Sequence, residues 1–235
     1  MTELIYMKDC YAKEFDATVT KVDGKYVVLD NTIFYPAGGG QPTDTGKLIK
    51  DKEEYKVVFA KKMGPDVSHE VDKEGLKEGD QVHGVLDWDR RYLLMRMHTA
   101  AHILCEIFHK EAGALITGNQ LNVDKSRIDF NLENFDREKM SEYVAKANEI
   151  VQKDLPIKIY FKPREEAMKI PSITKLANVL PPAVKELRIV EIEGFDIQAD
   201  GGTHVNSTKE VGEIEIVGAD NKGKNNRRVY YKLKD

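Results

Sequence analysis

The chain has 235 residues, of which 41% are hydrophobic and 32% charged, so it is long enough to bury a sizeable core and is not an intrinsically disordered sequence. Its formal net charge is −4, so any contact with nucleic acid has to come from a local basic cluster. No apolar run approaches the ~20 residues that span a bilayer, the acidic N-terminus is unlike a signal peptide, and two cysteines argue against a disulfide framework and favour the cytoplasm.

The first 86 residues have the pattern of short strands separated by turns. Apolar and polar residues alternate in several segments, and no stretch there has the period of a helix. Asp23-Gly24, between two such segments, is typical of a two-residue hairpin turn. We therefore expect a small β-barrel or sandwich over residues 1–86. Its strands are predicted at 16–22, 25–30, 32–36, 46–50, 55–60 and 81–88.

The pattern changes after residue 86. Residues 87–112 form the longest helical stretch, and a second helix is predicted over 136–154. A short helix with proline at its first position is expected at 163–169, followed by a proline-containing stretch at 170–184. Strands and helices alternate without a βαβ rhythm, so residues 87–235 are predicted to form an α+β domain. Its strands are expected at 114–117, 126–132, 157–162, 186–192, 211–217 and 227–233.

The long helix carries the segment HTAAH, in which His98 and His102 are four residues apart. This spacing puts both imidazoles on one face of a helix, so both can reach one metal ion. Cys105 offers a second pairing with His102, but seven residues rise about 10.5 Å, too far for His98 and Cys105 to share an ion. Cys105 lies in an apolar run and His109 near the helix end, so the metal is assigned to His98 and His102. The alternative is two core histidines bonded to carbonyls.

A second segment, QADGGTH at residues 198–204, supplies further ligand types. His204 is a third nitrogen ligand and Asp200 a candidate fourth, and the glycines between them allow the chain to curl so that both face one point. The alternative is that Asp200 and the glycines form a plain turn. Two spaced ligand pairs, about 100 residues apart, predict one metal site together.

These segments resemble a known family. HTAAH followed by DGGTHV is similar to the editing domain of alanyl-tRNA synthetase and of its free-standing AlaX relatives. FYPAGGGQPTDTG (34–46) resembles that family's glycine-rich motif, and IYFKPREEA (159–167) its downstream segment. The threonyl-tRNA synthetase editing domain shares the metal motif but not GGGQP. The resemblance implies the medium-length AlaX type, with a small β-barrel before a two-layer α+β editing domain.

The resemblance also implies a reaction. It is the zinc-dependent hydrolysis of serine, or glycine, from mischarged alanine tRNA, with one zinc ion held by His98, His102 and His204. The family's usual fourth ligand is cysteine, where this chain has Asp200. An aspartate oxygen can bind zinc, so Asp200 is expected either as a fourth ligand or as a support beside a three-histidine site. Gln198 can also reach the metal region.

Three further groups have expected roles. Backbone N–H groups of Gly201 and Gly202 are candidates for binding a developing oxyanion. Thr117 matches the family position that meets the serine hydroxyl, although it can equally be an ordinary threonine at a strand end. A basic cluster is a candidate for phosphate contact, or is a solvated strand end; it comprises Lys222, Lys224, Arg227 and Arg228, with Lys232 and Lys234 beyond them.

The glycine-rich motif of Gly38, Gly39, Gly40 and Gln41 lacks the Lys-Ser/Thr ending of a phosphate-binding P-loop. We expect it to have a packing role, or a role near the tRNA end, at the interface of the two domains. Two rival functions remain from the residues alone. One is a zinc-dependent hydrolase of another small ester or amide, and the other is a non-catalytic RNA-binding protein with structural zinc.

Overall fold

The computed structural model describes residues 1–133, 137–171, 173 and 185–234. It divides into two compact units, Met1–Leu93 and Leu94–Asp235. The boundary expected after residue 86 stays a prediction. Within the described residues, no helix is both long and apolar enough to cross a membrane.

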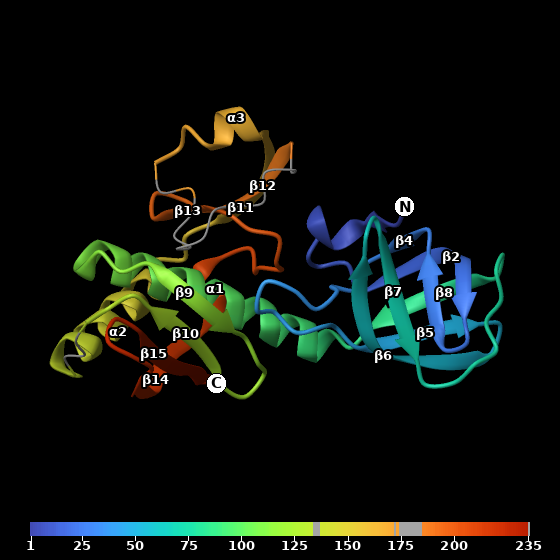
Figure 1. The fold of residues 1–235 in the computed structure, drawn as a ribbon, viewed down its shortest axis with the longest axis horizontal. Helices are drawn as coiled ribbons and strands as arrows, with labels where there is room; N and C mark the ends of the chain where they lie inside the picture. The colour runs from blue at the N-terminus through green and yellow to red at the C-terminus, as the bar shows by residue number, and fades with distance from the viewer. Residues whose placement is uncertain (134–136, 172, 174–184, 235) are drawn as a thin grey trace. The chain divides into compact units, whose positions relative to one another are not determined.

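The first unit is built around a closed barrel with the strand order β2-β3-β7-β6-β5-β8 (Figure 1). Inward-facing aliphatic and aromatic residues fill it, in the alternating pattern of strands that have one buried face. Gly24 takes a φ of 58° in the β2–β3 turn, a left-handed conformation that glycine adopts without strain. The barrel strands are β2 (Glu14–Asp23), β3 (Tyr26–Leu29), β5 (Gly46–Lys50), β6 (Glu53–Met63), β7 (Asp66–Val71) and β8 (Gln81–Leu86).

Short elements flank the barrel: β1 (Glu3–Leu4), which pairs with β4 (Asn31–Thr32), and the 3₁₀ turn Ile5–Met7. The strand expected at 32–36 is wrong beyond Thr32. There the backbone N–H of Phe34 donates to Thr32 Oγ1 and that of Tyr35 to Asp44 Oδ2, so side chains replace a strand partner. Strand β7 was not predicted, because Ser68, His69 and Glu70 interrupt its apolar pattern.

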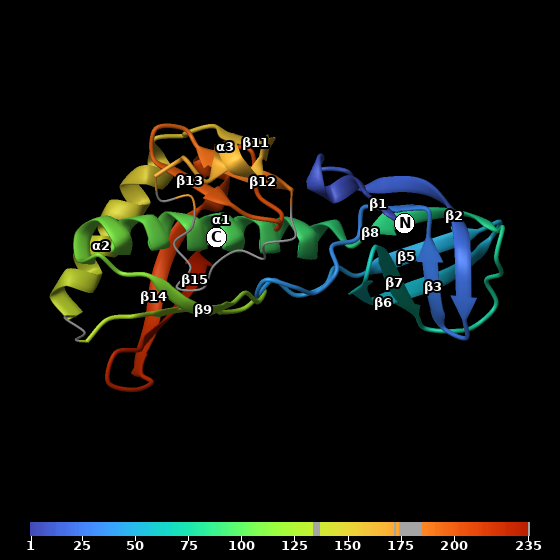
Figure 2. The same ribbon diagram turned by 45° about the horizontal axis from the view of Figure 1, so that its top comes forward.

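The second unit contains, among its described residues, two antiparallel sheets, helix α1 from Leu94 onward and two further helices. One sheet has the order β14-β15-β10-β9 and the other β11-β12-β13. Figures 1 and 2 both show helix α1 running between them. The elements are α1 (Trp88–Ala112), β9 (Ile116–Gln120), β10 (Ser126–Phe130), α2 (Arg137–Gln152), β11 (Ile157–Pro163), α3 (Arg164–Ala167), β12 (Glu186–Ile192), β13 (Asp196–Ala199), the 3₁₀ helix η2 (Thr208–Val211), β14 (Glu213–Asn221) and β15 (Arg227–Lys234).

Helix α1 is buried on every side over residues 97–108, as a helix covered by two sheets must be. It is followed by Gly113, whose N–H donates to His109 O at 2.8 Å. Gly113 has a φ of 63°, the left-handed conformation that commonly ends a helix. The short helix expected at 163–169 is confined to α3, and the stretch 170–184 lies largely outside the described residues. The predicted class, a β-barrel followed by an α+β part, is confirmed.

Candidate metal centre

Helix α1 presents His98 and His102 on one face. Their ring centroids are 5.2 Å apart, and both side chains are buried. The spacing of four residues produces this arrangement, because it corresponds to about one helical turn. Burial follows from the helix lying in the core of its unit, so neither imidazole is surrounded by water.

The turn after β13 supplies the other two side chains. Asp200 N–H donates to Arg188 O at 3.1 Å, and Arg188 Nη1 donates to Asp200 O at 2.8 Å, which fixes the backbone as it leaves the sheet. Gly202 N–H then donates to Asp200 Oδ1 at 2.6 Å. This local bond closes an aspartate turn, which turns the chain back and brings His204 toward α1.

The four side chains converge. His98, His102, Asp200 and His204 each offer one ligand atom, and these atoms lie within 4.8 Å of one another. Asp200 Oδ2 is 3.6 Å from His98 Nε2 and 3.9 Å from His102 Nε2, while Asp200 Oδ1 is 3.1 Å from His204 Nε2. The cluster found in the described part of the chain does not include Cys105.

Burial controls the charges of this cluster. It lowers the pKa of His98 to about 4 and, with repulsion from His98, lowers the pKa of His204 well below its usual range. Burial alone would raise the pKa of Asp200, but the surrounding imidazoles favour its ionised form and hold that pKa well below its usual range. At neutral pH, His98 and His204 are therefore neutral and Asp200 carries a negative charge.

This donor set fits a divalent metal ion. Neutral imidazole nitrogens and a carboxylate oxygen are zinc ligands, and two ligands of a tetrahedral zinc lie about 3.3 Å apart. The separations of 3.1 to 3.9 Å between Asp200 and the histidines are close to that value. A dication held there would face the ionised carboxylate of Asp200.

Two groups lie behind the histidines. Thr99 Oγ1 is 3.1 Å from His204 Nδ1, so it can accept that hydrogen when Nε2 faces the cluster. Asp196 Oδ2 is 3.4 Å from His102 Nδ1 and accepts a hydrogen bond from Gln198 Nε2 at 2.8 Å. Gln198, expected near the metal, thus contacts a neighbour of a ligand. Asp196 was not predicted, although the alternation of residues 196, 198 and 200 along a strand was available as a signal.

The glycines of the turn lie beside the cluster. Gly202 N–H is directed at Asp200 Oδ1, while a Cβ on Gly201 would meet nothing within 4 Å outside its chain neighbours. Open space at Gly201 is compatible with a ligand approaching its backbone. An oxyanion-binding role for either glycine stays a prediction.

Thr117 lies on β9, in the sheet that does not carry Asp200. It is exposed, and its hydroxyl donates to Asn226 Oδ1 at 3.2 Å, in the loop between β14 and β15. The described contacts therefore join Thr117 to that loop and not to the four clustered side chains. Its role in specificity stays a prediction.

The predicted basic cluster divides into two kinds of residue. Arg227 is buried, and its guanidinium donates to carbonyls of its own loop and to Glu133 O. Arg228 forms a bidentate ion pair with Asp129 at 2.7 and 2.9 Å. Lys222 and Lys224 are exposed at the loop, and Lys222 pairs with a neighbouring acidic residue. The lysines are the members whose charge faces solvent.

The glycine-rich loop is tightly held within the first unit. Gly39 and Gly40 have φ values of 58° and 88°, and Gly38 and Gln41 exchange backbone hydrogen bonds. Gln41 is buried. Glycine adopts the positive φ values found at positions 39 and 40 without strain, which explains the run of glycines in this loop.

The same loop ends in a buried ion pair. Asp44 and Arg91 are both fully buried, and Arg91 Nε donates to Asp44 Oδ2 at 2.9 Å. Arg91 also donates to Cys10 O and Ile33 O. The pair ties the loop, the N-terminal segment and the start of α1 together within this unit.

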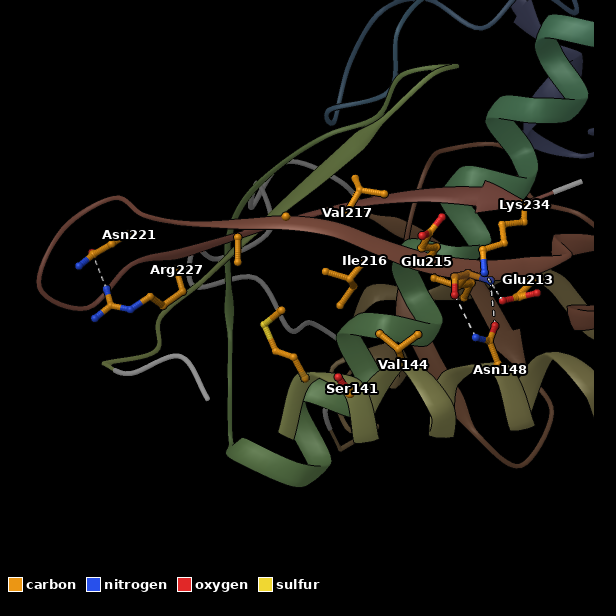
Figure 3. A pocket seen from close by; sticks show the side chains of 14 residues that line it. Ser141, Val144, Asn148, Glu213, Glu215, Ile216, Val217, Asn221, Arg227 and Lys234 are labelled. Atoms are coloured by element: carbon orange, nitrogen blue, oxygen red, sulfur yellow. Dashed lines mark hydrogen bonds and ion pairs between the residues drawn. The ribbon is translucent and has the colours of Figure 1, made fainter. Parts of the chain in front are cut away.

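A groove of about 860 Å³ lies between α2 and the β14–β15 hairpin (Figure 3). It is lined by none of the four clustered residues. The side chain of Asn148 on α2 bonds the backbone of β14 there: it accepts from Ile214 N at 2.8 Å and donates to Ile214 O at 2.9 Å. Among the described residues the groove gathers no set of ligand atoms comparable to that of the cluster, so the cluster, and not the groove, is the candidate site.

Comparison with known proteins agrees with this geometry. One family model, described as tRNA synthetases class II (A), matches residues 3–90. Another, described as Threonyl and Alanyl tRNA synthetase second additional domain, matches residues 187–230, which include Asp200 and His204. The barrel of the first unit and the ligand cluster of the second unit thus belong to a protein of the class related to these synthetases.

Full-length relatives specify the class further. The chain is 52% identical to the alanyl-tRNA editing protein AlaX-M of Methanosarcina barkeri and 49% identical to that of Saccharolobus solfataricus, in both cases over 100% of each chain. It is also 40% identical to the alanine–tRNA ligase of Pyrococcus abyssi over 92% of this chain and 24% of the ligase. The chain belongs to the AlaX-M family of alanyl-tRNA editing proteins.

Proposed function

We propose that this chain is a trans-editing hydrolase that removes serine, and also glycine, from mischarged alanine tRNA at a zinc site. The observation that carries the proposal is the convergence of His98, His102, Asp200 and His204 in a chain of this family. The relatives' names, which specify alanyl-tRNA editing, and the buried cluster of possible metal ligands both support this proposal.

The cluster residues would hold the metal. When bound, zinc supplies a Lewis acid that polarises an ester carbonyl and acidifies water. The three histidines would contribute imidazole nitrogens, and Asp200 would contribute the negative charge that faces a dication in a buried place. Gly202 N–H fixes Asp200 Oδ1 at 2.6 Å, so the carboxylate is orientated before any ligand arrives. Burial also excludes bulk water, which strengthens each electrostatic contact.

Selection of serine over alanine requires a group that recognises a hydroxyl. A site that hydrogen-bonds a substrate hydroxyl rejects an analogue without it far better than an apolar pocket does. We assign this role to Thr117. Its exposed hydroxyl already has a partner in Asn226, and the two can exchange that bond for one to a substrate.

Contact with the tRNA is proposed for the exposed lysines of the β14–β15 loop. Lys222 and Lys224 carry charges at the surface, as phosphate contacts require. Arg227 and Arg228 act on the loop itself through their internal bonds. The proposed place of action is the cytoplasm, where charged tRNA is used.

Deacylation assays test this proposal directly. Alanine tRNA charged with serine, glycine or alanine is incubated with metal-free and with zinc-loaded protein. We expect loss of serine and of glycine and little loss of alanine, all dependent on zinc. Stoichiometric zinc without release of any of the three amino acids would favour a non-catalytic RNA-binding protein with structural zinc. Equal hydrolysis of simple esters would favour a general zinc hydrolase.

A further inference from the structure

Asp196 is a buried carboxylate behind the ligand cluster. It is the first residue of β13, its side chain has no exposed surface, and Oδ2 lies 3.4 Å from Nδ1 of His102. Gln198 Nε2 donates to the same oxygen at 2.8 Å. Burying an ionised carboxylate is costly unless donors face it, so the position of Asp196 beside a histidine nitrogen calls for a reason.

His102 provides that reason. Its Nδ1 is buried and has no hydrogen-bond partner among the described residues, while its Nε2 faces Asp200 Oδ2 at 3.9 Å. An imidazole offers a lone pair at Nε2 only in the tautomer that carries the hydrogen on Nδ1. A buried N–H needs an acceptor, and Asp196 Oδ2 is a few tenths of an ångström beyond the usual hydrogen-bond distance of about 2.9 Å.

We propose that Asp196 is a positioning residue for His102: its carboxylate accepts the Nδ1 hydrogen and so fixes the tautomer and ring orientation in which Nε2 binds metal. The inference rests on the proposed metal function. A carboxylate behind a ligand histidine also raises the basicity of that imidazole and strengthens its bond to the ion.

His204 makes the contrast within the same cluster. Its Nδ1 lies 3.1 Å from the hydroxyl of Thr99, a neutral partner that orientates the ring without adding charge. Behind Nδ1 of His102, by contrast, lies a carboxylate oxygen. Strand alternation places Asp196, Gln198 and Asp200 on one side of β13 and its continuation. One segment thus supplies both a ligand and the support of a second ligand that comes from α1.

Metal competition measures the predicted effect. Metal-free wild type, Asp196→Ala and Asp196→Asn compete for zinc against a chromophoric chelator. We expect a zinc Kd about 10- to 100-fold weaker for Asp196→Ala. Asp196→Asn keeps the shape and an acceptor oxygen but loses the charge, so its loss should be smaller. Asp129→Asn is the matched control, because Asp129 is also a buried carboxylate but pairs with Arg127 and Arg228; its zinc Kd should not change.

The tautomer of His102 gives a second measurement that needs no metal. In ¹⁵N-histidine spectra of the metal-free protein, His102 should carry its hydrogen on Nδ1 in the wild type and in Asp196→Asn, and lose that preference in Asp196→Ala. A merely structural role would leave the tautomer unchanged. An unchanged zinc Kd or an unchanged tautomer in Asp196→Ala overturns the inference. If Asp196→Ala does not fold and Asp196→Asn does, an unchanged zinc Kd in Asp196→Asn overturns it. Lack of zinc binding by the wild type overturns the proposed function instead, and the tautomer then decides on Asp196.

Discussion

Buried histidines occur in both units, and they differ in what their ring nitrogens contact. In the barrel, His69 Nδ1 donates to Val27 O at 3.2 Å and Nε2 accepts from Thr32 Oγ1 at 2.9 Å, so both nitrogens have partners. In the second unit, the ligand nitrogens of His98, His102 and His204 face one another and Asp200 instead. Burial lowers the pKa of His69 and of His98 alike, to about 4 in each case.

The comparison shows that burial and a lowered pKa do not by themselves mark a functional site. His69 shows the same depression as His98 while serving the barrel core. Convergence of four ligand atoms within 4.8 Å of one another distinguishes the cluster. The same reasoning separates Arg228, whose guanidinium is bound to Asp129, from the exposed Lys224. Side chains whose bonds are satisfied within the protein and side chains proposed to meet a ligand should therefore respond differently to substitution.

The largest effect is expected from His98→Ala. Removing one of three nitrogen ligands should abolish stoichiometric zinc binding and reduce serine deacylation by at least about 100-fold, since metal catalysis contributes several kcal/mol to the transition state. Zinc content by elemental analysis and the deacylation rate are the measurements. The barrel should still unfold cooperatively.

His69→Gln is the matched variant for this comparison. It should destabilise the barrel and leave the zinc content unchanged. Loss of zinc from His69→Gln, or full activity with stoichiometric zinc in His98→Ala, would contradict the distinction between the two kinds of buried histidine.

The second prediction concerns pH and the barrel. The folded pKa of His69 is about 4, below its ordinary value of 6.5, because burial disfavours the charged ring. Above pH 6.5 the ring is neutral in both the folded and the unfolded state. As the pH falls below this value the unfolded chain takes up a proton that the folded chain does not, so stability is lost down to about pH 4. The expected loss from this group is about 3 kcal/mol.

Urea denaturation at about pH 7 and about pH 4.5, on either side of most of this transition, measures the loss. The fluorescence of Trp88, the single tryptophan, reports on the first unit. His69→Gln should be less stable than the wild type at neutral pH and should lose less stability on acidification. Parallel losses in the two proteins would mean that carboxylates alone control the acid response.

The third prediction concerns the hydroxyl group of Thr117. Thr117→Val keeps the side-chain shape but removes the hydroxyl that now bonds Asn226. If this hydroxyl meets the substrate serine, serine deacylation should fall about five- to thirtyfold, or about 1–2 kcal/mol, and alanine release should fall less. The ratio of the two rates is measured on one tRNA preparation at one salt concentration.

Asn226→Ala is the control for Thr117→Val. It removes the loop partner and leaves the hydroxyl in place. A ratio that changes equally in both variants would mean that Thr117 acts only by holding the β14–β15 loop.

The smallest effect is expected from the loop lysines. Replacing Lys222 and Lys224 by alanine should weaken tRNA binding and reduce the slope of log affinity against log salt by about 1 for each phosphate that is no longer neutralised. Filter binding over a range of KCl concentrations gives the slope. Arg228→Gln, which breaks the pair with Asp129, should lower the stability of the protein and leave the salt slope unchanged. A reduced slope in this variant, with an unchanged slope in the lysine variant, would mean that Arg228 and not the lysines contacts the tRNA phosphates.

Parts of this molecule were predictable from sequence because local pattern decides them. The barrel strands alternate, α1 is long and ends at a glycine, and four-residue spacing puts His98 and His102 on one face. Strand β13 was missed because four residues carry too short a pattern, and with it Asp196. The partner of Arg228 was not predictable either, because Asp129 lies 99 residues away and only sheet register brings the two together.

The ligand cluster contains no sulfur among its described members. A metal-bound thiolate is also a redox group, since it is oxidised through sulfenic acid and condenses with other thiols. Imidazole and carboxylate have no such chemistry. The two cysteines of the chain, Cys10 and Cys105, are buried and lie outside the cluster. In the proposed site Asp200 takes the fourth place, so oxidants that disable thiolate sites would leave its ligands unchanged, and metal binding there would not depend on the thiol balance of the cell.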